Sequence, residues 1–340
     1  MSLTRMNRVK KILNRQPVDK IPVQVNYTNK MGSLLSEYWN IPFEELDKIF
    51  NNHFFRVNLT YEKRIDKDKK IDYDWWGAGF DMNEEGYLVC DYPLKGVDNA
   101  DNFKWPDPEA PGLMENAKKA IEKERNVLNR FIAPNFGFAL FERAWSLCGL
   151  QEFMMDMYTA PELAETILEK ITEINIVLAK RFVGLGVDGG YFGDDLGAQK
   201  SMLFSPDKWK EIFKPRMKRM FSCFTDAGLP VIMHSDGDIK PIIPDLIEIG
   251  LSCLNPIQPE ILDHKWLKKE YGKDLSFYGG VSTQDVLPHG TKAEVIEAGK
   301  NCLKDLASDG TGLLYGPSHR IISDIPMENI DAFLETYNNL

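Results

Sequence analysis

From residue 131 onward the chain repeats one pattern, in which a short apolar run ends in polar or glycine residues and a longer helical segment follows. The apolar runs have the length of buried strands and lack the alternation of half-exposed strands. Six such units follow one another. Their apolar runs begin at Phe131, Val187, Pro230, Leu251, Leu275 and Gly312. Strands that alternate with helices in this way predict a parallel sheet covered by crossover helices.

Two earlier apolar segments, residues 21–27 and 54–61, bring the expected number of parallel strands to about eight. Eight strands with crossover helices in 340 residues predict an α/β fold of the (β/α)8 TIM-barrel type. The length by itself allows one large domain or two small ones. A doubly wound open sheet is the alternative, and it is less favoured because no G-x-G-x-x-G sequence opens a helix after the first strand.

Residues 66–111 interrupt this pattern with aromatic side chains scattered among Asp, Gly and Pro. Short strands and loops are expected here, with a hairpin-like turn at Glu85-Gly86. Such aromatic-rich loops are more often a packed lid or a satellite core than a cofactor-binding segment. Trp75 and Trp76 are nevertheless candidates for an apolar wall beside an active site.

The composition restricts the partners of the protein. A formal net charge of -10 argues against nucleic acid and anionic membranes, since both bind basic surfaces. The five cysteines are widely spaced and form no C-x-x-C pair, which predicts free thiols in a reducing cytosol. The basic N-terminus lacks an apolar signal core, and no run of about 18 apolar residues occurs. We expect a soluble cytoplasmic protein whose partner is a small molecule or another protein.

Polar residues occur where the predicted strands end. In a barrel these ends face one mouth, where active sites lie. The residues at these positions are Asn26, Asn135, Asp194, Asp195, His234, Asp236, Asn255, Gln258, Ser282, Gln284, Ser318 and His319. We expect them to surround one mouth of the barrel.

His234 and Asp236 form an H-x-D sequence directly after a buried apolar run. Residues i and i+2 of an extended segment point the same way and lie about 6.5 Å apart, so both side chains can reach one metal ion. His319 would complete three protein ligands and leave a position open, as in catalytic zinc sites. Glu142 would add a carboxylate to the ion or support its ligands. Spacing alone favours a simpler interpretation, in which the histidines only make local hydrogen bonds, because H-x-D is a frequent chance pattern.

Asp194 and Asp195 are candidates for a base, a metal ligand or a group that holds substrate, and the alternative is an N-cap and a salt bridge.

His53, His264 and His289 lie in polar stretches and are interpreted as surface residues. The sequence contains no P-loop, no G-x-S-x-G elbow and no recognisable nucleophilic cysteine. Acyl and phosphoryl transfer are therefore disfavoured.

Several stretches, read together, resemble the uroporphyrinogen decarboxylase superfamily. The most specific is His234-Ser-Asp-Gly-Asp238 with the segments 244–250 and 254–259. The other matching segments are 8–22, 193–199, 205–206, 214–216, 278–281 and 316–319. The resemblance spans nearly the whole chain and implies a single (β/α)8 barrel domain over residues 1–340.

The superfamily contains two kinds of enzyme. Its decarboxylases, which act in porphyrin and haem biosynthesis, carry an R-Q-A-G-R-Y motif after the first strand for the carboxylates of their substrate. Residues 26–32 occupy this place here and contain no arginine, the side chain that pairs with carboxylates in a bidentate manner. The chain is therefore more similar to the corrinoid-dependent methyltransferases and O-demethylases. Uroporphyrinogen decarboxylation remains the alternative, and a non-catalytic barrel that binds a small molecule or a corrinoid protein is a second one.

In the methyltransferase branch, zinc is held by a His-x-Cys pair and a later Cys and works with a separate corrinoid protein. His234 falls on the histidine of this pattern, Asp236 on the first cysteine and His319 on the second. Both replacements are residues that can bind metal, which favours a real site. Zinc is expected, with iron or manganese as alternatives for this N and O donor set.

The resemblance thus implies a zinc-dependent methyltransferase that moves a methyl group between a small methylated substrate and a corrinoid protein. A homodimer would fit the family. The expected metal ligands are His234, Asp236, His319 and Glu142, and the expected catalytic residues are His234, Asp236 and Asp194. The expected substrate-binding residues are Asn26, Tyr27, Asn135, Trp145, Tyr191, Asp195, Gln258 and Gln284.

Overall fold

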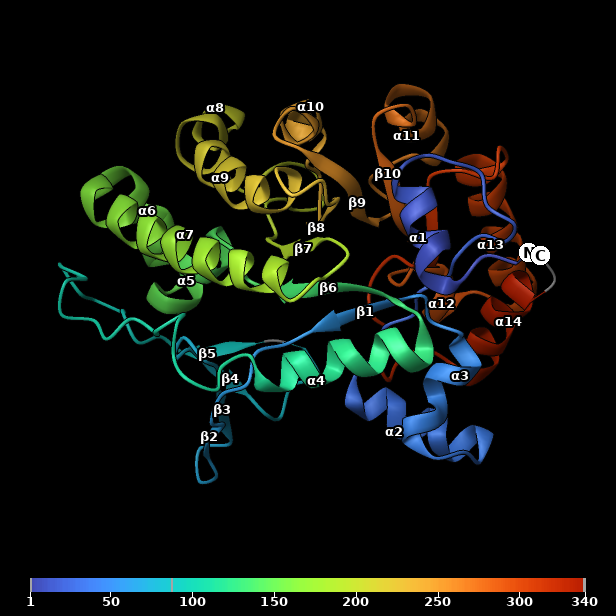
Figure 1. Cartoon of the computed structure of the whole chain (residues 1–340), viewed down its shortest axis with the longest axis horizontal. Coiled ribbons are helices and arrows are strands. Elements are labelled where there is room, and N and C mark those ends of the chain that lie inside the picture. The colour runs from blue at the N-terminus through green and yellow to red at the C-terminus, as the bar shows by residue number, and fades with distance from the viewer. Residues whose placement is uncertain (1, 87, 339–340) are drawn as a thin grey trace.

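The computed structural model describes residues 2–86 and 88–338, and its centre is a curled parallel sheet surrounded by helices (Figure 1). Within this described part of the chain the sheet has seven strands in the order β1-β6-β7-β8-β9-β10-β11. The strands are β1 (Phe54–Val57), β6 (Phe131–Phe136), β7 (Gly190–Gly193), β8 (Val231–His234), β9 (Leu251–Ile257), β10 (Ser276–Val281) and β11 (Leu313–Pro317). Every neighbouring pair is parallel, as the six repeated units predicted.

Residues 21–27 close this sheet between β11 and β1. Val23 forms a parallel bridge with Tyr315, and Tyr27 forms another with Ile321. On the opposite side the His53 N–H donates to the Val23 carbonyl oxygen at 3.1 Å. The strand predicted over residues 21–27 is therefore present as isolated bridges that occupy the eighth position. The TIM-barrel-like α/β fold is confirmed, and the open doubly wound sheet is wrong.

Helices cover the outside of the sheet (Figure 1). The longer ones are α1 (Arg5–Leu13), α2 (Asn29–Trp39), α4 (Glu115–Lys123), α5 (Phe141–Cys148), α6 (Leu150–Thr159), α7 (Pro161–Gly184), α9 (Lys214–Thr225), α11 (His264–Tyr271), α13 (Lys292–Ala307) and α14 (Met327–Asn338). The shorter ones are η1 (Phe43–Glu45), α3 (Leu46–Phe50), η2 (Glu124–Leu128), α8 (Pro206–Lys208), η3 (Trp209–Phe213), η4 (Lys240–Ile242), α10 (Ile243–Glu248) and α12 (Val286–His289). The sequence did not predict α2 or α6. Across the described residues, we find no helix with both the length and the apolar character that a membrane span requires.

The interior of the barrel holds a compact apolar cluster. Residues of all seven strands contribute to it, and α1 adds Val9, Ile12 and Leu13 from one end. The strand residues are Phe54, Phe131, Ala133, Tyr191, Ile232, Cys253, Tyr278 and Leu314. This arrangement leaves the other end of the barrel, where the strands finish, as the open end.

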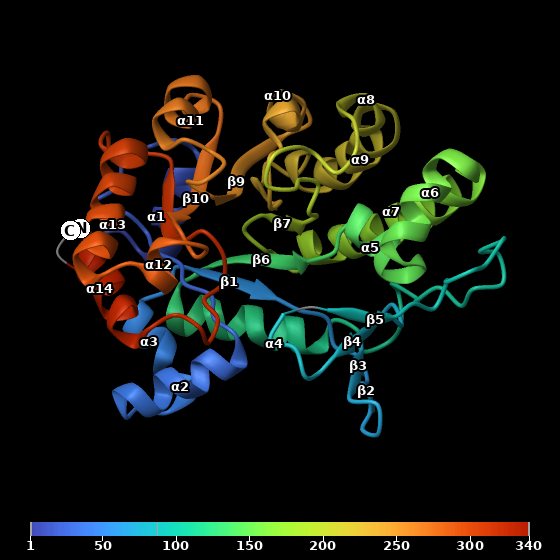
Figure 2. The same cartoon turned by 180° about the vertical axis from the view of Figure 1, so that it is seen from behind.

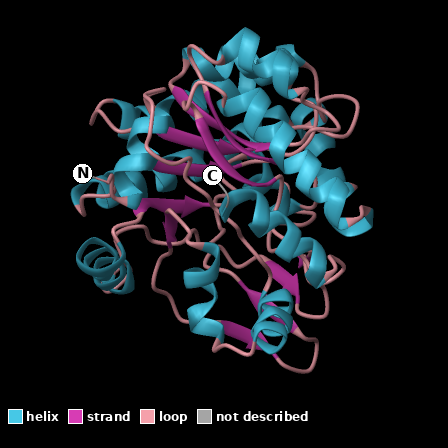
Figure 3. Ribbon diagram, turned by 90° about the vertical axis from the view of Figure 1, so that its right-hand side faces the viewer, coloured by secondary structure: helices cyan, strands magenta, loops and turns pink. Residues whose placement is uncertain are grey.

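A second sheet lies beside that open end (Figures 2 and 3). It is antiparallel and consists of β2 (Arg64–Asp66), β3 (Ile71–Tyr73), β4 (Gly79–Asp81) and β5 (Val89–Asp91). In Figure 2 the arrows of β1 and β6 point toward the side on which this sheet, α5 and α6 lie. Asp74 joins the sheet to α5 through an ion pair with Arg143 at 2.5 Å. The short strands predicted within residues 66–111 are confirmed.

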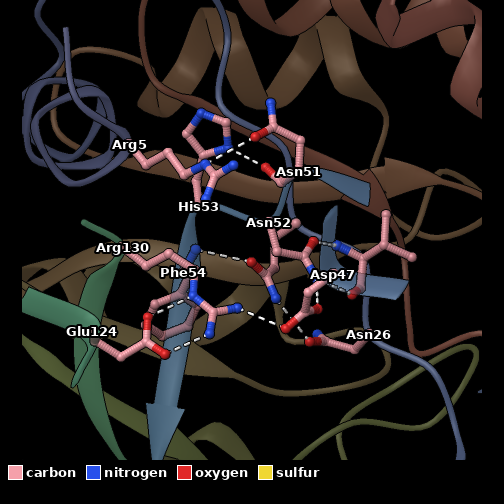
Figure 4. A network of polar contacts seen from close by, with 11 residues as sticks. Arg5, Asn26, Asp47, Asn51, Asn52, His53, Phe54, Glu124 and Arg130 are labelled. Atoms are coloured by element: carbon pink, nitrogen blue, oxygen red, sulfur yellow. Dashed lines mark hydrogen bonds and ion pairs between the residues drawn. The ribbon is translucent and has the colours of Figure 1, made fainter. Parts of the chain in front are cut away.

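Side-chain amides of Gln24 and Asn52 complete the hydrogen bonding between residues 22–27 and the start of β1, a contact called the seam below (Figure 4). The Asn52 amide accepts from the Val25 N–H at 2.8 Å and donates to the Val25 carbonyl oxygen at 3.0 Å. Gln24 accepts from the Phe54 N–H at 2.9 Å. These contacts replace backbone ladder bonds, so the buried backbone groups stay satisfied where the strand pairing is discontinuous.

Candidate metal centre and active site

Three residues that could bind a metal converge at the open end of the barrel. His234 ends β8, Asp236 follows two residues later, and His319 lies two residues after the end of β11. One ligand atom of each residue lies within 4.8 Å of the corresponding atoms of the other two. The Nε2 atoms of His234 and His319 each lie 3.8 Å from a carboxylate oxygen of Asp236. The structure thus brings together three of the four predicted metal ligands.

A tight turn after β8 gives Asp236 its position. Gly237 has φ of +86°, and a Cβ atom at this residue would collide with the backbone of Gly197. The turn is held from two sides, since Asp195 accepts from the Asp236 N–H and Gln258 accepts from the Gly237 N–H, both at 2.8 Å. A glycine is required here because the left-handed conformation and the close approach both exclude a side chain.

Asn255 on β9 orients the His234 ring. Its Oδ1 lies 2.8 Å from His234 Nδ1 and also accepts from the Tyr191 hydroxyl at 3.2 Å. Its Nδ2 donates to the Tyr278 carbonyl oxygen at 3.2 Å, which determines the orientation of the amide. His234 Nδ1 is therefore the protonated nitrogen, and the lone pair of Nε2 faces Asp236. Asn255 was expected at the mouth, but this positioning contact was not predicted.

The donor set fits a divalent cation. Asp236 Oδ1 is buried and accepts no hydrogen bond from the described residues. Burial, together with the neighbouring His234 and Arg320 side chains, holds the pKa of His319 well below its usual range. A neutral imidazole is the form that binds metal. Two imidazoles and one carboxylate match a catalytic zinc site with an open coordination position.

The acidic residues behind this cluster differ in their surroundings. Asp194 is fully buried and accepts from the backbone N–H groups of Leu140, Phe141 and Glu142 at 3.3, 3.0 and 2.8 Å. Burial raises its pKa to about 7 although these hydrogen bonds oppose the change. These contacts cap the N-terminus of α5, which is the alternative that the sequence left open. The catalytic role expected of Asp194 stays a prediction.

Asp195 lies closer to the cluster than Asp194. Its Oδ1 is 3.6 Å from His234 Nε2, and its side chain is 36% exposed. Glu142 is buried and lies outside the group of three converging ligand atoms. Burial and the neighbouring carboxylates of Asp195 and Asp194 raise the pKa of Glu142 well above its usual value. Its role as a fourth ligand stays a prediction.

Four of the predicted substrate-binding residues line or adjoin the barrel interior. Asp195, Tyr191 and Gln258 make the contacts described above. Asn26 donates to the Tyr278 hydroxyl at 2.8 Å. Hydrogen bonds connect these residues either to residues in or next to the group of His234, Asp236 and His319, or to Tyr278, which lies in the interior.

The other four predicted substrate-binding residues contact neither the three candidate ligands nor Tyr278 in the hydrogen bonds and ring contacts that follow. The Tyr27 ring packs against Phe43 and Phe50, with ring centroids 6.1 and 5.4 Å apart. Trp145 packs against Phe138 at 5.6 Å. Two further pairs are hydrogen-bonded and exposed, Asn135 with Asn58 at 3.0 Å and Gln199 with Gln284 at 2.9 Å. Their roles in substrate binding stay predictions.

Arg56 is a residue of the barrel interior that was not predicted. Its guanidinium carbon lies 4.9 Å from the centroid of the Tyr191 ring. An arginine inside the apolar strand Phe54-Phe-Arg-Val57, two residues after an inward-facing phenylalanine, was the available signal.

His53 was assigned to the surface wrongly, because it is fully buried, whereas the His264 side chain is part-buried. Burial lowers the pKa of both imidazoles, that of His53 to about 3. His289 is exposed, as predicted.

The fold and this cluster define a TIM-barrel protein with a candidate metal centre at the carboxyl ends of its strands. The uroporphyrinogen decarboxylase (URO-D) family matches residues 73–340, and the chain belongs to this family. The expected superfamily is thereby confirmed.

Two proteins that are similar to this chain are methyltransferases, and the sequence resembles the methyltransferase branch of the superfamily. The chain is 21% identical over 247 residues to the methylated-thiol–coenzyme M methyltransferase of Methanosarcina mazei, and the alignment covers 69% of this chain and 61% of that protein. It therefore spans less than two thirds of the curated relative. A solved structure of a methyltransferase from Methanosarcina mazei is similar with a TM-score of 0.75 and 19% identity, and the match covers 99% of both chains. This likeness supports the fold.

Proposed function

We propose that this protein is a metal-dependent methyltransferase that moves a methyl group between a small methylated substrate and a corrinoid carried by a partner protein. The observation that carries the proposal is the convergence of His234, Asp236 and His319 at the mouth of the barrel. The methyltransferase relatives support the class of reaction. Zinc is the proposed metal because two imidazoles and one carboxylate form a known catalytic zinc ligand set.

The residues of the mouth have separate tasks in this proposal. A bound zinc ion would supply Lewis acidity at the heteroatom that carries or accepts the methyl group. His234, Asp236 and His319 would hold the ion, and Asn255 keeps the Nε2 lone pair of His234 directed toward it. Asp195 would orient the substrate, because its half-exposed carboxylate lies beside His234.

Asp194 and Glu142 would support the site from behind. Asp194 holds the first turn of α5 through three backbone N–H groups and thereby positions Glu142, which α5 carries. The β2–β5 sheet and α5 flank the mouth and would limit the access of water to the reacting groups (Figure 2).

Elemental analysis of the purified protein tests the metal centre. The comparison includes wild type, the double variant His234→Ala/His319→Ala and the control His289→Ala, which changes an exposed histidine. We expect near-stoichiometric zinc in wild type and control and its loss from the double variant. If wild type takes up no metal even after zinc is added, the Lewis-acid mechanism is wrong.

A second experiment tests the transfer itself. The zinc-loaded protein is incubated with cob(I)alamin and, in turn, a methylated thiol, a methyl ether and a methylamine, and formation of methylcobalamin is followed by absorbance. We expect turnover with one substrate class and none with the double variant. Release of carbon dioxide from uroporphyrinogen without metal would instead identify a decarboxylase. Turnover in neither assay would favour a barrel that only binds its ligand.

A further inference from the structure

Helix α6 is apolar on both of its faces. Phe153 and Met157 are buried against the rest of the protein. Leu150, Met155 and Tyr158 lie on the other side of the helix and are 42%, 54% and 61% exposed. A surface helix normally presents charged and polar residues to water on the side opposite its buried stripe. The outer face of α6 therefore has the composition of a surface that another protein covers.

The exposed side chains form one continuous surface. Leu150, Met154 and Tyr158 follow one another at a spacing of four residues, so they lie in a row along the helix, and Met155 lies beside this row. Tyrosine often anchors protein interfaces, and the unbranched methionine side chain adapts to the shape of a partner. A surface hollow of about 660 Å³ is lined by the residues called the α6 face below, which are Leu150, Gln151, Met154, Met155, Tyr158 and Thr159.

Helix α6 lies beside the mouth of the barrel. Asp194, which follows β7, caps the first turn of α5. Helix α5 packs on α6 through Phe141 and Phe153, whose ring centroids are 6.1 Å apart. Figure 2 shows both helices on the side toward which the arrows of β1 and β6 point. A protein that binds the α6 face is therefore adjacent to the open end of the barrel.

An unpaired carboxylate borders the α6 face. Glu152 and Asp156 lie one turn apart along one edge of this surface. Glu152 pairs with Lys95 at 3.6 Å, whereas Asp156 has no ion pair with any described residue. Lys208 lies over the Tyr158 ring, 5.2 Å from its centroid, and is itself paired with a carboxylate at 3.0 Å. A complementary partner would combine apolar side chains with a basic residue that faces Asp156.

These charges argue against a second copy of the same chain on the α6 face. In a two-fold contact the same surface meets itself. Two antiparallel α6 helices would bring Glu152 and Asp156 of one copy close to the same residues of the other, and like charges in an interface repel. The formal net charge of -10 adds to this repulsion. A different protein with a basic surface is therefore favoured.

We propose that the α6 face is the docking surface for the corrinoid-carrying partner, which contributes apolar side chains with Lys or Arg beside them. The identity of the partner rests on the proposed methyltransferase function, because that reaction requires a protein that presents its corrinoid at the mouth. One helix face offers less area than a permanent interface. A small interface releases its partner readily, as a carrier of methyl groups requires.

Binding of purified corrinoid proteins tests the docking surface. The probes are the corrinoid proteins encoded in the same genome as this chain, each loaded with hydroxocobalamin, and biolayer interferometry measures their binding. We expect one of them to bind wild type. Met155→Glu and Tyr158→Glu should each weaken this binding at least about tenfold, because they place a charge in an apolar contact. Val127→Glu is the matched control, since Val127 is 68% exposed but lies on η2.

A second pair of variants tests the charge of the partner. We expect Asp156→Lys to weaken binding several-fold, and added salt to weaken the binding of wild type, because an attraction between opposite charges is lost. Glu122→Lys makes the same change in net charge at an exposed residue of α4 and should keep wild-type binding. Tighter binding by Asp156→Lys would contradict a basic partner.

Three results would overturn the docking surface. In the first, no corrinoid protein binds wild type, and in the second, Met155→Glu and Tyr158→Glu bind as tightly as wild type. In the third, light scattering shows a wild-type dimer that these two variants dissociate, which would assign the α6 face to a second copy.

Turnover with free cob(I)alamin separates this proposal from the proposed function. Both α6 variants should keep the wild-type rate in that assay, since the α6 face does not include the three converging ligands. Turnover with free cob(I)alamin but no binding of a corrinoid protein would support the proposed function alone. Binding that depends on the α6 face, without methyl transfer, would support the docking surface alone.

Discussion

Asn255 Oδ1 lies 2.8 Å from His234 Nδ1, and this contact determines which imidazole nitrogen faces the candidate ligands. The amide cannot turn over without losing the bond from its Nδ2 to the Tyr278 carbonyl oxygen. Because Oδ1 only accepts, Nδ1 donates and Nε2 keeps its lone pair. The tautomer of His234 is thus set before any metal arrives.

Replacement of Asn255 should therefore weaken metal binding. We expect Asn255→Leu to lower the affinity for zinc about 10- to 100-fold, because His234 loses the partner that fixes its tautomer and ring orientation. Competition with a chromophoric chelator measures this loss. Tyr191→Phe is the control, since it removes the other hydrogen bond to the same oxygen at 3.2 Å and leaves the acceptor in place. Wild-type affinity in Asn255→Leu would contradict this role.

Much of this site could be predicted because strand geometry is local. His234 and Asp236 were paired from the i, i+2 rule applied at the end of one apolar run. His319 belongs to a distant strand, and only the barrel topology and the family resemblance placed it beside them. Asp194 and Asp195 could not be told apart, because they follow the end of β7 and their directions depend on the loop.

The errors also have physical causes. His53 stands in a polar stretch, and its burial arises from tertiary packing that the local sequence does not show. The strand over residues 21–27 forms only bridges, because Asn52 and Gln24 side chains replace part of its ladder. These contacts join segments far apart in the chain.

Arg130 stabilises the seam beside β1 through two carboxylates (Figure 4). It lies 2.6 Å from Glu124 and 2.8 Å from Asp47, and the Arg130 and Glu124 side chains are 7% and 4% exposed. We expect Arg130→Met to lower the free energy of unfolding by about 3–5 kcal/mol, because Glu124 stays buried without its partner. Urea unfolding measures this change.

Two controls separate this effect from the loss of an ordinary ion pair. The double variant Arg130→Met/Glu124→Gln removes the buried charge as well and should recover most of the loss. Arg219→Met breaks the more exposed pair with Glu169 and should cost less than about 1 kcal/mol. Equal costs for Arg130→Met and Arg219→Met would contradict the buried pair's importance.

His53 should make the protein sensitive to acid. Burial, together with the nearby charges of Arg8 and Arg5, lowers its pKa to about 3 although its Nδ1 lies 2.8 Å from the Asn51 carbonyl oxygen. Between the usual value of about 6.5 and this value, the unfolded chain binds a proton that the folded protein excludes. Stability therefore falls as the pH drops through this window.

The variant His53→Gln tests this effect because an amide does not titrate. The free energy of unfolding, measured in urea at several pH values from 6.5 to 4, should fall less steeply than in wild type. The difference in slope should approach about 1.4 kcal/mol per pH unit. His289→Gln changes an exposed histidine and should keep the wild-type slope. Parallel slopes for His53→Gln and wild type would show that His53 is not the responsible group.

Glu85 fastens the second sheet to two loops of the barrel. Its carboxylate accepts from the Thr28 hydroxyl, from the Ser323 N–H at 2.9 Å and from the Ser323 hydroxyl at 2.6 Å. Ser323 lies shortly after His319, so this contact joins the β4–β5 connection to the loop that carries a candidate ligand. The sheet therefore has a specific attachment at the mouth.

Loss of this attachment should loosen the sheet without unfolding the barrel. We expect Glu85→Ala to speed hydrogen exchange of the β4, β5 and Ser323 amides about tenfold or more, because three hydrogen bonds to one carboxylate are lost. The melting temperature should change little, since the barrel core is not involved. Glu84→Ala changes an exposed neighbour and should leave exchange unchanged. Equal exchange in Glu85→Ala and wild type would mean that other contacts hold the sheet, with the Arg143–Asp74 ion pair as the next candidate.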